Sequence, residues 1–166
     1  MILASAFVAF AADAAAQSSS SPRGTGRAAI ARAHTLPLAT NLAEDAEVGA
    51  RGRKPILLFF DREECPYCER ALREYLVPLS RDEWKDRALF RQVEMDRALP
   101  VIDFDGRPTT HAALAARYKA TLSPTVLVVD GKGTPLSGPL VGLMTVDFYG
   151  SYLENALTEA SKRMRR

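Results

Sequence analysis

Apolar residues along this chain are grouped in a way that predicts several strands. Residues 56–60 are all apolar, which is typical of a strand buried on both faces. Residues 90–96 alternate between apolar and polar side chains, and residues 126–130 are rich in β-branched side chains, so both segments are predicted strands. Residues 135–141 should pair as the next antiparallel strand, and residues 34–38 are a candidate for a short edge strand.

Helical spacing and end signals predict helices before and after the first of these strands. Asn41 is a suitable N-terminal cap for a helix over residues 41–50. A second helix should begin directly after Cys65, because apolar residues then recur at helical spacing. This helix is expected to run to about Val77, where Pro78 bends or ends it.

The middle of the chain combines a cap signal with a loop. The sequence Ser-Arg-Asp-Glu at residues 80–83 is a capping-box pattern, which predicts a further helical piece extending through Trp84. We expect Trp84 to be a packing residue rather than a ligand platform. Residues 99–108 have the composition of a loop with an Asp-Gly turn, and they are a candidate for a small hairpin.

Two more helices are predicted in the second half of the chain. Thr109 or Thr110 should cap a helix that stops near Ala120, with His111 in its first turn as an ordinary surface side chain. Residues 146–164 form an amphipathic pattern typical of a terminal helix. The side chains expected to point inward from it are Phe148, Tyr152, Leu153, Ala156 and Leu157.

The chain has two cysteines, Cys65 and Cys68, placed where a predicted strand ends and a helix begins. If Cys65 caps the helix and Pro66 is its first residue, the Cys65 sulfur faces unpaired backbone N–H groups at the positive helix end. That position favours the thiolate. Cys68 lies one turn later on the same face, where it can attack a mixed disulfide formed at Cys65.

Two other uses of the cysteine pair are less consistent with the sequence. A structural disulfide across so short a loop gains little chain-entropy stabilisation, because that contribution grows with loop length. A structural zinc site normally takes four Cys or His ligands, and beyond the pair the chain offers only His34 and His111. A Cys-x-x-Cys pair beside a β-α-β pattern therefore indicates a redox role.

Length and composition fit one globular domain. The 166 residues and the 47% hydrophobic content suffice for a moderate core. The net charge of +2 is too small to indicate nucleic-acid binding, because the basic residues are interleaved with acidic ones.

The N-terminal segment predicts export. Residues 1–16 combine an apolar core with small residues, which resembles a secretory signal peptide, although no basic residue precedes the core and Asp13 lies in the cleavage region. The apolar run is too short for a membrane-spanning helix. Residues 17–33 have the Ser, Gly and Pro content of a flexible arm, which leaves residues 34–166 as the folded domain.

The order of these elements resembles the thioredoxin superfamily over residues 36–163. The matching segments are Cys65-Pro66-Tyr67-Cys68, residues 93–96, Ala116-x-Tyr118, Pro124-Thr125 and Val141-Gly142. The resemblance implies an α/β, thioredoxin-like three-layer fold, with a central mixed β-sheet flanked by helices. It extends to exported bacterial thioredoxin-like proteins, which implies a periplasmic location.

The resemblance also implies roles for individual residues. Cys65 matches the family's nucleophile and Cys68 its resolving thiol. The proline matching Pro124 is cis in the family and packs against the active-site sulfurs, while the residue matching Ser123 offers backbone hydrogen bonds to an extended substrate. Together with Pro66 and Tyr67, which set the redox poise, Ser123 and Pro124 make up the expected substrate-binding residues.

The sequence departs from thioredoxin itself near the cysteines. The Pro-Tyr dipeptide between them is that of glutaredoxins, and Phe59 occupies the position of the buried acid that thioredoxins carry six residues before the first cysteine. Asp61 or Glu64 would then have to help proton transfer through water.

These observations predict a thiol–disulfide oxidoreductase that reduces disulfides in exported proteins. The expected enzyme is a monomer recharged by a membrane-bound thiol reductant, and it needs no external cofactor or metal because the dithiol itself carries two electrons. Alternatives are an oxidising disulfide donor and a glutaredoxin-like, glutathione-dependent reductase. The third alternative is a non-enzymatic docking module that binds a soft cation such as copper(I) through the thiolates.

Overall fold

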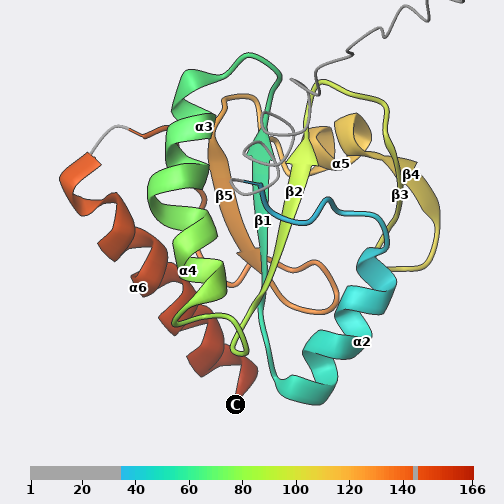
Figure 1. The fold of residues 1–166 in the computed structure, drawn as a ribbon. Coiled ribbons are helices and arrows are strands. Elements are labelled where there is room, and N and C mark those ends of the chain that lie inside the picture. The colour runs from blue at the N-terminus through green and yellow to red at the C-terminus, as the bar shows by residue number, and fades with distance from the viewer. Residues whose placement is uncertain (1–34, 144–145) are drawn as a thin grey trace, which may run out of the picture.

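The computed structural model describes residues 35–143 and 146–166, and a four-stranded sheet lies at its centre (Figure 1). The strands are β1 Ile56–Asp61, β2 Leu89–Glu94, β5 Thr125–Val129 and β6 Leu140–Val141. Their order is β2-β1-β5-β6, with β1 parallel to β2 and the other neighbours antiparallel. The predicted leader over residues 1–16 and the predicted arm over residues 17–33 lie outside the described residues.

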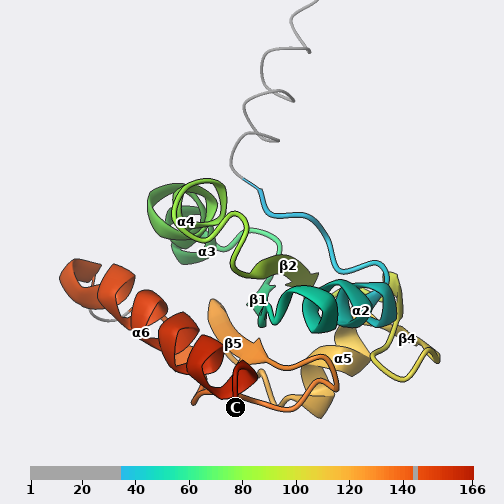
Figure 2. The ribbon, with the colours of Figure 1, turned by 90° about the horizontal axis from the view of Figure 1, so that it is seen from below.

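Helices cover both faces of this mixed sheet (Figure 2), which confirms the predicted α/β class and its three layers. The remaining elements are α2 Leu42–Gly52, α3 Pro66–Ala71, the π-helical segment η1 Leu72–Leu76, α4 Val77–Arg81, α5 His111–Arg117, α6 Val146–Met164, and the hairpin strands β3 Pro100–Ile102 and β4 Pro108–Thr110. The helices α3, α4 and α6 pack on one face, and α2 and α5 pack on the other. Within the described residues, no helix is both long enough and apolar enough to cross a membrane.

Strand β1 is the centre of the core, and all of its residues are buried. Its alternate side chains serve different layers, as the pleat of a strand requires. Leu57 and Phe59 belong to the apolar cluster under α3 and α6, whereas Leu58 and Phe60 belong to the cluster under α2 and α5. Asp61, two residues after Phe59, therefore points toward the layer that contains α3.

Several predicted element ends are confirmed by their caps. The Asn41 side chain accepts a hydrogen bond from the backbone N–H of Glu44, and Thr110 caps α5 in the same way through the N–H of Ala113. The predicted hairpin is present, and its turn contains Gly106 with a φ of +81°, a conformation that favours glycine.

Of the two outcomes predicted at Pro78, a bend or an end of the helix, the end is wrong, because helical turns continue to Arg81. The backbone N–H of Val77 donates to the carbonyl of Leu72, five residues earlier, so the chain widens into a π turn directly before the proline. Pro78 then falls in the first turn of α4, where its missing N–H costs little.

The capping-box helix predicted after Ser80 is also absent from the structure. The Ser80 hydroxyl donates to the carbonyl of Val77 and so closes the end of α4, and residues 82–87 form turns instead. Trp84 is buried in the cluster beneath α3 and α6, which confirms that it is a packing residue.

The predicted edge segments are shorter than expected. Only Leu140–Val141 pairs with β5 in register, and Pro135 adds one isolated bridge to Val129. Pro135 and Pro139 lack the N–H that a continuous ladder requires. In the described part of the segment at residues 34–38, pairing is limited to a bridge from Leu38 to Gln92, next to Pro37.

The terminal helix has the predicted limits, but two side chains expected on its inner face are exposed. Phe148 is 58% and Tyr152 is 47% exposed. The buried stripe consists of Tyr149, Leu153, Ala156, Leu157 and Ala160. The Tyr149 ring meets that of Tyr75, in the neighbouring segment η1 of the same layer, edge-on with 5.2 Å between the ring centroids.

His111 was expected to be a surface residue, and it is 1% exposed. Its Nδ1 accepts a hydrogen bond from the backbone N–H of Glu94 at 2.9 Å, and its Nε2 lies 2.8 Å from the carbonyl of Ala39. The ring therefore joins α5 to β2 and to the segment before α2. This correction depends on tertiary contacts that helix periodicity does not encode.

Candidate active site

Cys65 caps the helix α3, as its position before Pro66 predicted. Its backbone is extended, Pro66 begins the helix, and the N–H of Cys68 donates to the Cys65 sulfur at 3.1 Å. The sulfur thus occupies the place that an Asp or Ser oxygen takes in an ordinary N-cap. Unpaired N–H groups and the helix dipole at this point favour a thiolate when the pair is reduced.

Cys65 and Cys68 form a disulfide, with their Cα atoms 5.2 Å apart. The two sulfurs differ in accessibility, because Cys65 is half-buried whereas Cys68 is only 2% exposed and packs in the core under α3. A partner molecule can therefore reach Cys65, while Cys68 lies behind it.

One cavity lies on the β5 side of the segment that carries the disulfide, and it reaches Tyr67, which stands between the two cysteines. It measures about 380 Å³ and is lined by Tyr67, Ser123, Pro124, Gly142 and Leu143. The Ser123–Pro124 peptide bond is cis, and the carbonyl of Pro124 accepts a hydrogen bond from the N–H of Gly142. The fold thus brings together three of the four residues expected to bind substrate; the fourth, Pro66, is exposed at the start of α3 but does not line this cavity.

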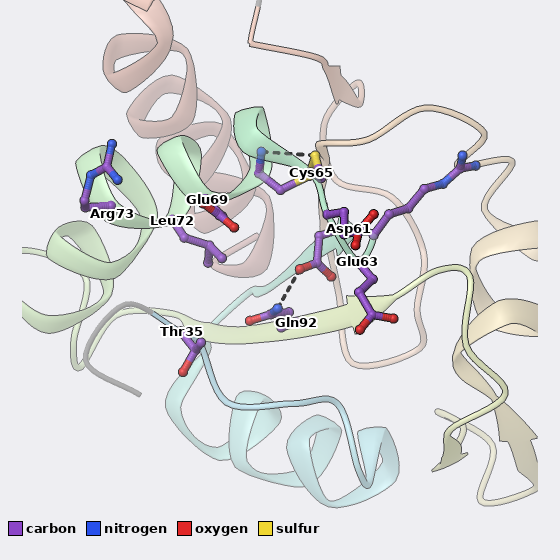
Figure 3. Close-up of a pocket in the computed structure, with 11 residues that line it drawn as sticks. Thr35, Asp61, Glu63, Cys65, Glu69, Leu72, Arg73 and Gln92 are labelled. Carbon is purple, nitrogen blue, oxygen red and sulfur yellow. Dashed lines mark hydrogen bonds between the residues drawn. A yellow bond between two sulfur atoms is a disulfide. The ribbon is translucent and has the colours of Figure 1, made fainter. Parts of the chain in front are cut away.

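A second cavity lies on the other side of the disulfide, toward β2 (Figure 3). It measures about 390 Å³ and touches both Cys65 and Cys68. Its other lining residues are Thr35, Asp61, Arg62, Glu63, Glu64, Glu69, Leu72, Arg73 and Gln92. Four carboxylates and two guanidinium groups line the cavity, so its lining is acidic on balance.

Asp61 is the most unusual of these lining residues, because it is a carboxyl group with only 6% of its surface exposed. Gln92 Nε2 donates a hydrogen bond to Asp61 Oδ2 at 2.6 Å. Burial raises the pKa of Asp61 to about 7; the hydrogen bond from Gln92 acts against this shift, and the negative charges of Glu94 and Asp96 add to it. From the sequence, either Asp61 or Glu64 could help proton transfer at the cysteine pair. The sequence alone did not show that Asp61 is the buried one of the two.

Metal-binding chemistry finds little support in the part of the chain that the structure describes. There, no group of three or more His, Cys, Asp or Glu side chains could hold a metal ion. Both ring nitrogens of His111 are engaged by the backbone, so this residue is not a ligand for the cysteine pair.

Comparison with known proteins agrees with this architecture. The family model described as a thioredoxin-like domain matches residues 42–157. No curated protein matches the chain.

Solved thioredoxin structures are similar to the chain in fold. Malassezia sympodialis thioredoxin is 17% identical with a TM-score of 0.53, and the alignment covers 77% of this chain and 92% of that one. Fasciola hepatica thioredoxin is 16% identical with a TM-score of 0.53, covering 75% and 99% respectively. Oxidised mitochondrial thioredoxin 3 from Saccharomyces cerevisiae is 17% identical with a TM-score of 0.51, covering 75% and 94%.

The family match spans most of the chain, and it includes the strand, the Cys-x-x-Cys pair at the start of α3 and the cis-proline loop beside it. From this match and the shared fold, we conclude that the chain belongs to the thioredoxin-like family.

Proposed function

We propose that this protein is a thiol–disulfide oxidoreductase that reduces disulfides in exported proteins. The fold and the Cys65–Cys68 pair support thiol–disulfide exchange in general. The observation that carries the proposal is the unequal burial of the two sulfurs at a helix N-terminus, with Cys65 accessible and Cys68 behind it. This is the arrangement that a nucleophile and a resolving thiol require.

The exchange proceeds in two steps that use only these two sulfurs. The Cys65 thiolate attacks one sulfur of the substrate disulfide, so a Cys65–substrate bond forms and the other substrate sulfur leaves as a thiolate. The Cys68 sulfur then attacks Cys65, which re-forms the intramolecular disulfide and releases the second substrate thiolate. Two electrons pass to the substrate, and a membrane-bound thiol reductant would return them to the enzyme.

The β5-side cavity is the proposed substrate groove. Tyr67, which is 64% exposed, lines it together with Ser123 and Pro124. The backbone of Ser123 would bind an extended peptide segment that carries the target cysteine, which is recognition by main-chain hydrogen bonds and requires little sequence specificity.

The charges around the disulfide support reduction rather than oxidation as the direction. Glu63, Glu64 and Glu69 line the cavity beside the pair, together with the two basic residues Arg62 and Arg73. Negative charge disfavours the Cys65 thiolate and so disfavours the dithiol form relative to the disulfide, which makes the pair a stronger reductant. We propose that the protein acts in this direction in the periplasm, as a monomer.

A glutathione-dependent reductase is the second candidate, since Pro66 and Tyr67 give the pair the dipeptide of glutaredoxins and Tyr67 borders an open groove. Turnover of a glutathionylated peptide in the presence of glutathione would favour it. A lack of such turnover, together with reduction of protein disulfides, would favour the first proposal.

The reduction potential tests the proposed direction. We expect equilibration with glutathione redox buffers to give a value near that of thioredoxin, about −270 mV. A potential above about −150 mV would identify a disulfide donor instead and would contradict the reductase proposal.

A further inference from the structure

We propose that the β2-side cavity selects substrates: it binds an arginine or lysine side chain that lies two residues from the target cysteine of the oxidised protein, and Asp61 and Gln92 accept its hydrogen bonds. This inference rests on the proposed thiol–disulfide exchange and names the class of substrate that the exchange favours.

The cavity lies where a side chain of the bound substrate can reach it. It touches both Cys65 and Cys68, and Cys65 is the sulfur that a partner molecule can reach. Its volume of about 390 Å³ is sufficient for one long side chain. In an extended peptide, side chains two residues apart point in the same direction, so a residue two positions from a cysteine bonded to Cys65 also faces the enzyme.

Two buried oxygens in this cavity lack a hydrogen-bond donor. Asp61 is 6% and Gln92 is 8% exposed, and Gln92 Nε2 donates to Asp61 Oδ2 (Figure 3). Among the described residues, neither Asp61 Oδ1 nor Gln92 Oε1 has a hydrogen-bond partner. A buried acceptor without a donor is costly, and arginine and lysine side chains carry several donors and no acceptor. A cationic side chain therefore complements this buried pair.

The charge of the cavity favours the same ligand. Arg62 donates to the carbonyl of Thr121. Arg73 is paired with Glu74, so both guanidinium groups of the lining are engaged elsewhere. Three exposed carboxylates also line the cavity, and they attract a cation toward the buried pair. These are Glu63, Glu64 and Glu69.

An organic cation fits these groups better than a metal ion does. A metal ion requires several ligands around one point. Within the part of the chain that the structure describes, no three His, Cys, Asp or Glu side chains are grouped in that way. A long side chain, in contrast, can meet carboxylates at separate points along the cavity.

The protonation state of Asp61 makes this selection dependent on pH. Burial raises the pKa of Asp61 to about 7, and its ionised form is the one that attracts a cation. The preference for a basic substrate should therefore be stronger at pH 8 than at pH 6. The other charged groups that face Asp61, from β2 and from around the cavity, are Glu94, Asp96, Arg62, Glu63, Glu64, Glu69 and Arg73.

Stopped-flow reaction with matched peptides tests the preference. Each peptide carries one cysteine as a mixed disulfide with thionitrobenzoate, and arginine, glutamine or glutamate occupies both positions two residues from it. The Cys65 thiolate attacks the peptide sulfur, thionitrobenzoate leaves as a coloured thiolate, and Cys68 then releases the peptide. With reduced full-length protein in excess, we expect the arginine peptide to react at least about tenfold faster than the glutamine peptide, and the glutamate peptide to react slowest.

The ratio of the arginine to the glutamine rate constant isolates the cavity, because a change in Cys65 reactivity affects both peptides alike. We expect Asp61→Asn to lower this ratio to below about threefold and to abolish its increase between pH 6 and pH 8. Gln92→Met, which removes one acceptor, should lower the ratio about threefold.

Glu47→Gln is the matched control. It removes an exposed carboxylate on α2, outside the cavity, and should leave the ratio within about twofold of the native value. The native preference should also persist at about 0.5 M salt, where attraction between exposed charges is screened.

The possible failures are distinguishable. Equal rate constants for the three peptides, or an unchanged ratio in Asp61→Asn, would remove the cavity from substrate selection. A ratio that Glu47→Gln or high salt lowers as much as Asp61→Asn does would show attraction by overall charge alone, and would also overturn the proposal. If no peptide released thionitrobenzoate, the proposed thiol exchange itself would fail, whatever the cavity binds.

Discussion

At the scale of single residues, the chemistry of the site depends on how strand β1 divides its side chains between the two faces of the sheet. Phe59 fills the core where thioredoxins carry an acid, and the acid in this chain is Asp61, one pleat further along the same face. In this position Asp61 lines a cavity that both cysteines share.

The burial of Asp61 has a consequence for stability that is independent of catalysis. Burial raises the pKa of Asp61 from 3.8 to about 7, so the folded state holds this proton more tightly than the unfolded state. The contribution of Asp61 therefore favours folding at low pH, and it is lost as the pH rises from about 4 to 7. We expect Asp61→Asn, which cannot ionise, to gain on the order of 2 kcal/mol relative to the native protein between pH 5 and pH 8.

Urea unfolding of the oxidised proteins at the two pH values measures this difference. Asp103, whose pKa is lowered by its hydrogen bond to Arg117, changes stability in the opposite sense with pH, but it is present in both proteins and cancels. A difference between native protein and variant that does not change with pH would contradict the raised pKa of Asp61.

Residue roles that depend on local sequence could be predicted, whereas those that depend on distant contacts could not. Cys65 as a helix cap follows from the adjacent Pro66, because cap geometry involves only neighbouring residues. The burial of Asp61 depends on Gln92, and the burial of His111 depends on Glu94 and Ala39, which come from other elements.

At the scale of elements, His111 joins three separate parts of the chain. Its ring bonds the backbone of β2 and the segment before α2 while it sits on α5. We expect His111→Ala to lower the free energy of unfolding by about 2 to 4 kcal/mol, because it removes a buried ring and leaves a backbone N–H and a carbonyl without partners.

Chemical unfolding combined with an assay of protein-disulfide reduction tests this expectation. The variant should retain its disulfide reduction at temperatures where it is folded, since His111 lines neither of the two cavities described above. A decrease in the free energy of unfolding of less than about 0.5 kcal/mol would show that the His111 ring does not stabilise the packing of these elements.

Element boundaries were predictable where side chains signal them and were mispredicted where the backbone has alternatives. The cap residues Asn41 and Thr110 set the starts of α2 and α5 correctly. Pro78 does not end the helix, because the π turn before it places it in the first turn of α4. Residues 135–141 contain prolines, which limit the predicted strand to its last two residues.

At the scale of the whole molecule, the fold places one cavity on each side of the segment that carries the disulfide. The strand order β2-β1-β5-β6 puts the cis-proline loop on the β5 side and the Asp61–Gln92 pair on the β2 side. The overall fold could be predicted because the order of the strands, the cysteine pair and the Ser-Pro-Thr segment resembles the thioredoxin superfamily. The pairing of two cavities could not be predicted, because it arises from strand order.

The central claim is that Cys65 attacks the substrate and Cys68 resolves the product. Its most direct test is mass spectrometry of covalent adducts after reduced Cys68→Ser and reduced Cys65→Ser are each mixed with a disulfide-bonded peptide. The account predicts a stable one-to-one mixed disulfide at Cys65 in Cys68→Ser and none in Cys65→Ser, whose remaining thiol is buried. Equal trapping by both variants, or trapping by Cys65→Ser alone, would contradict the assignment of the two thiols.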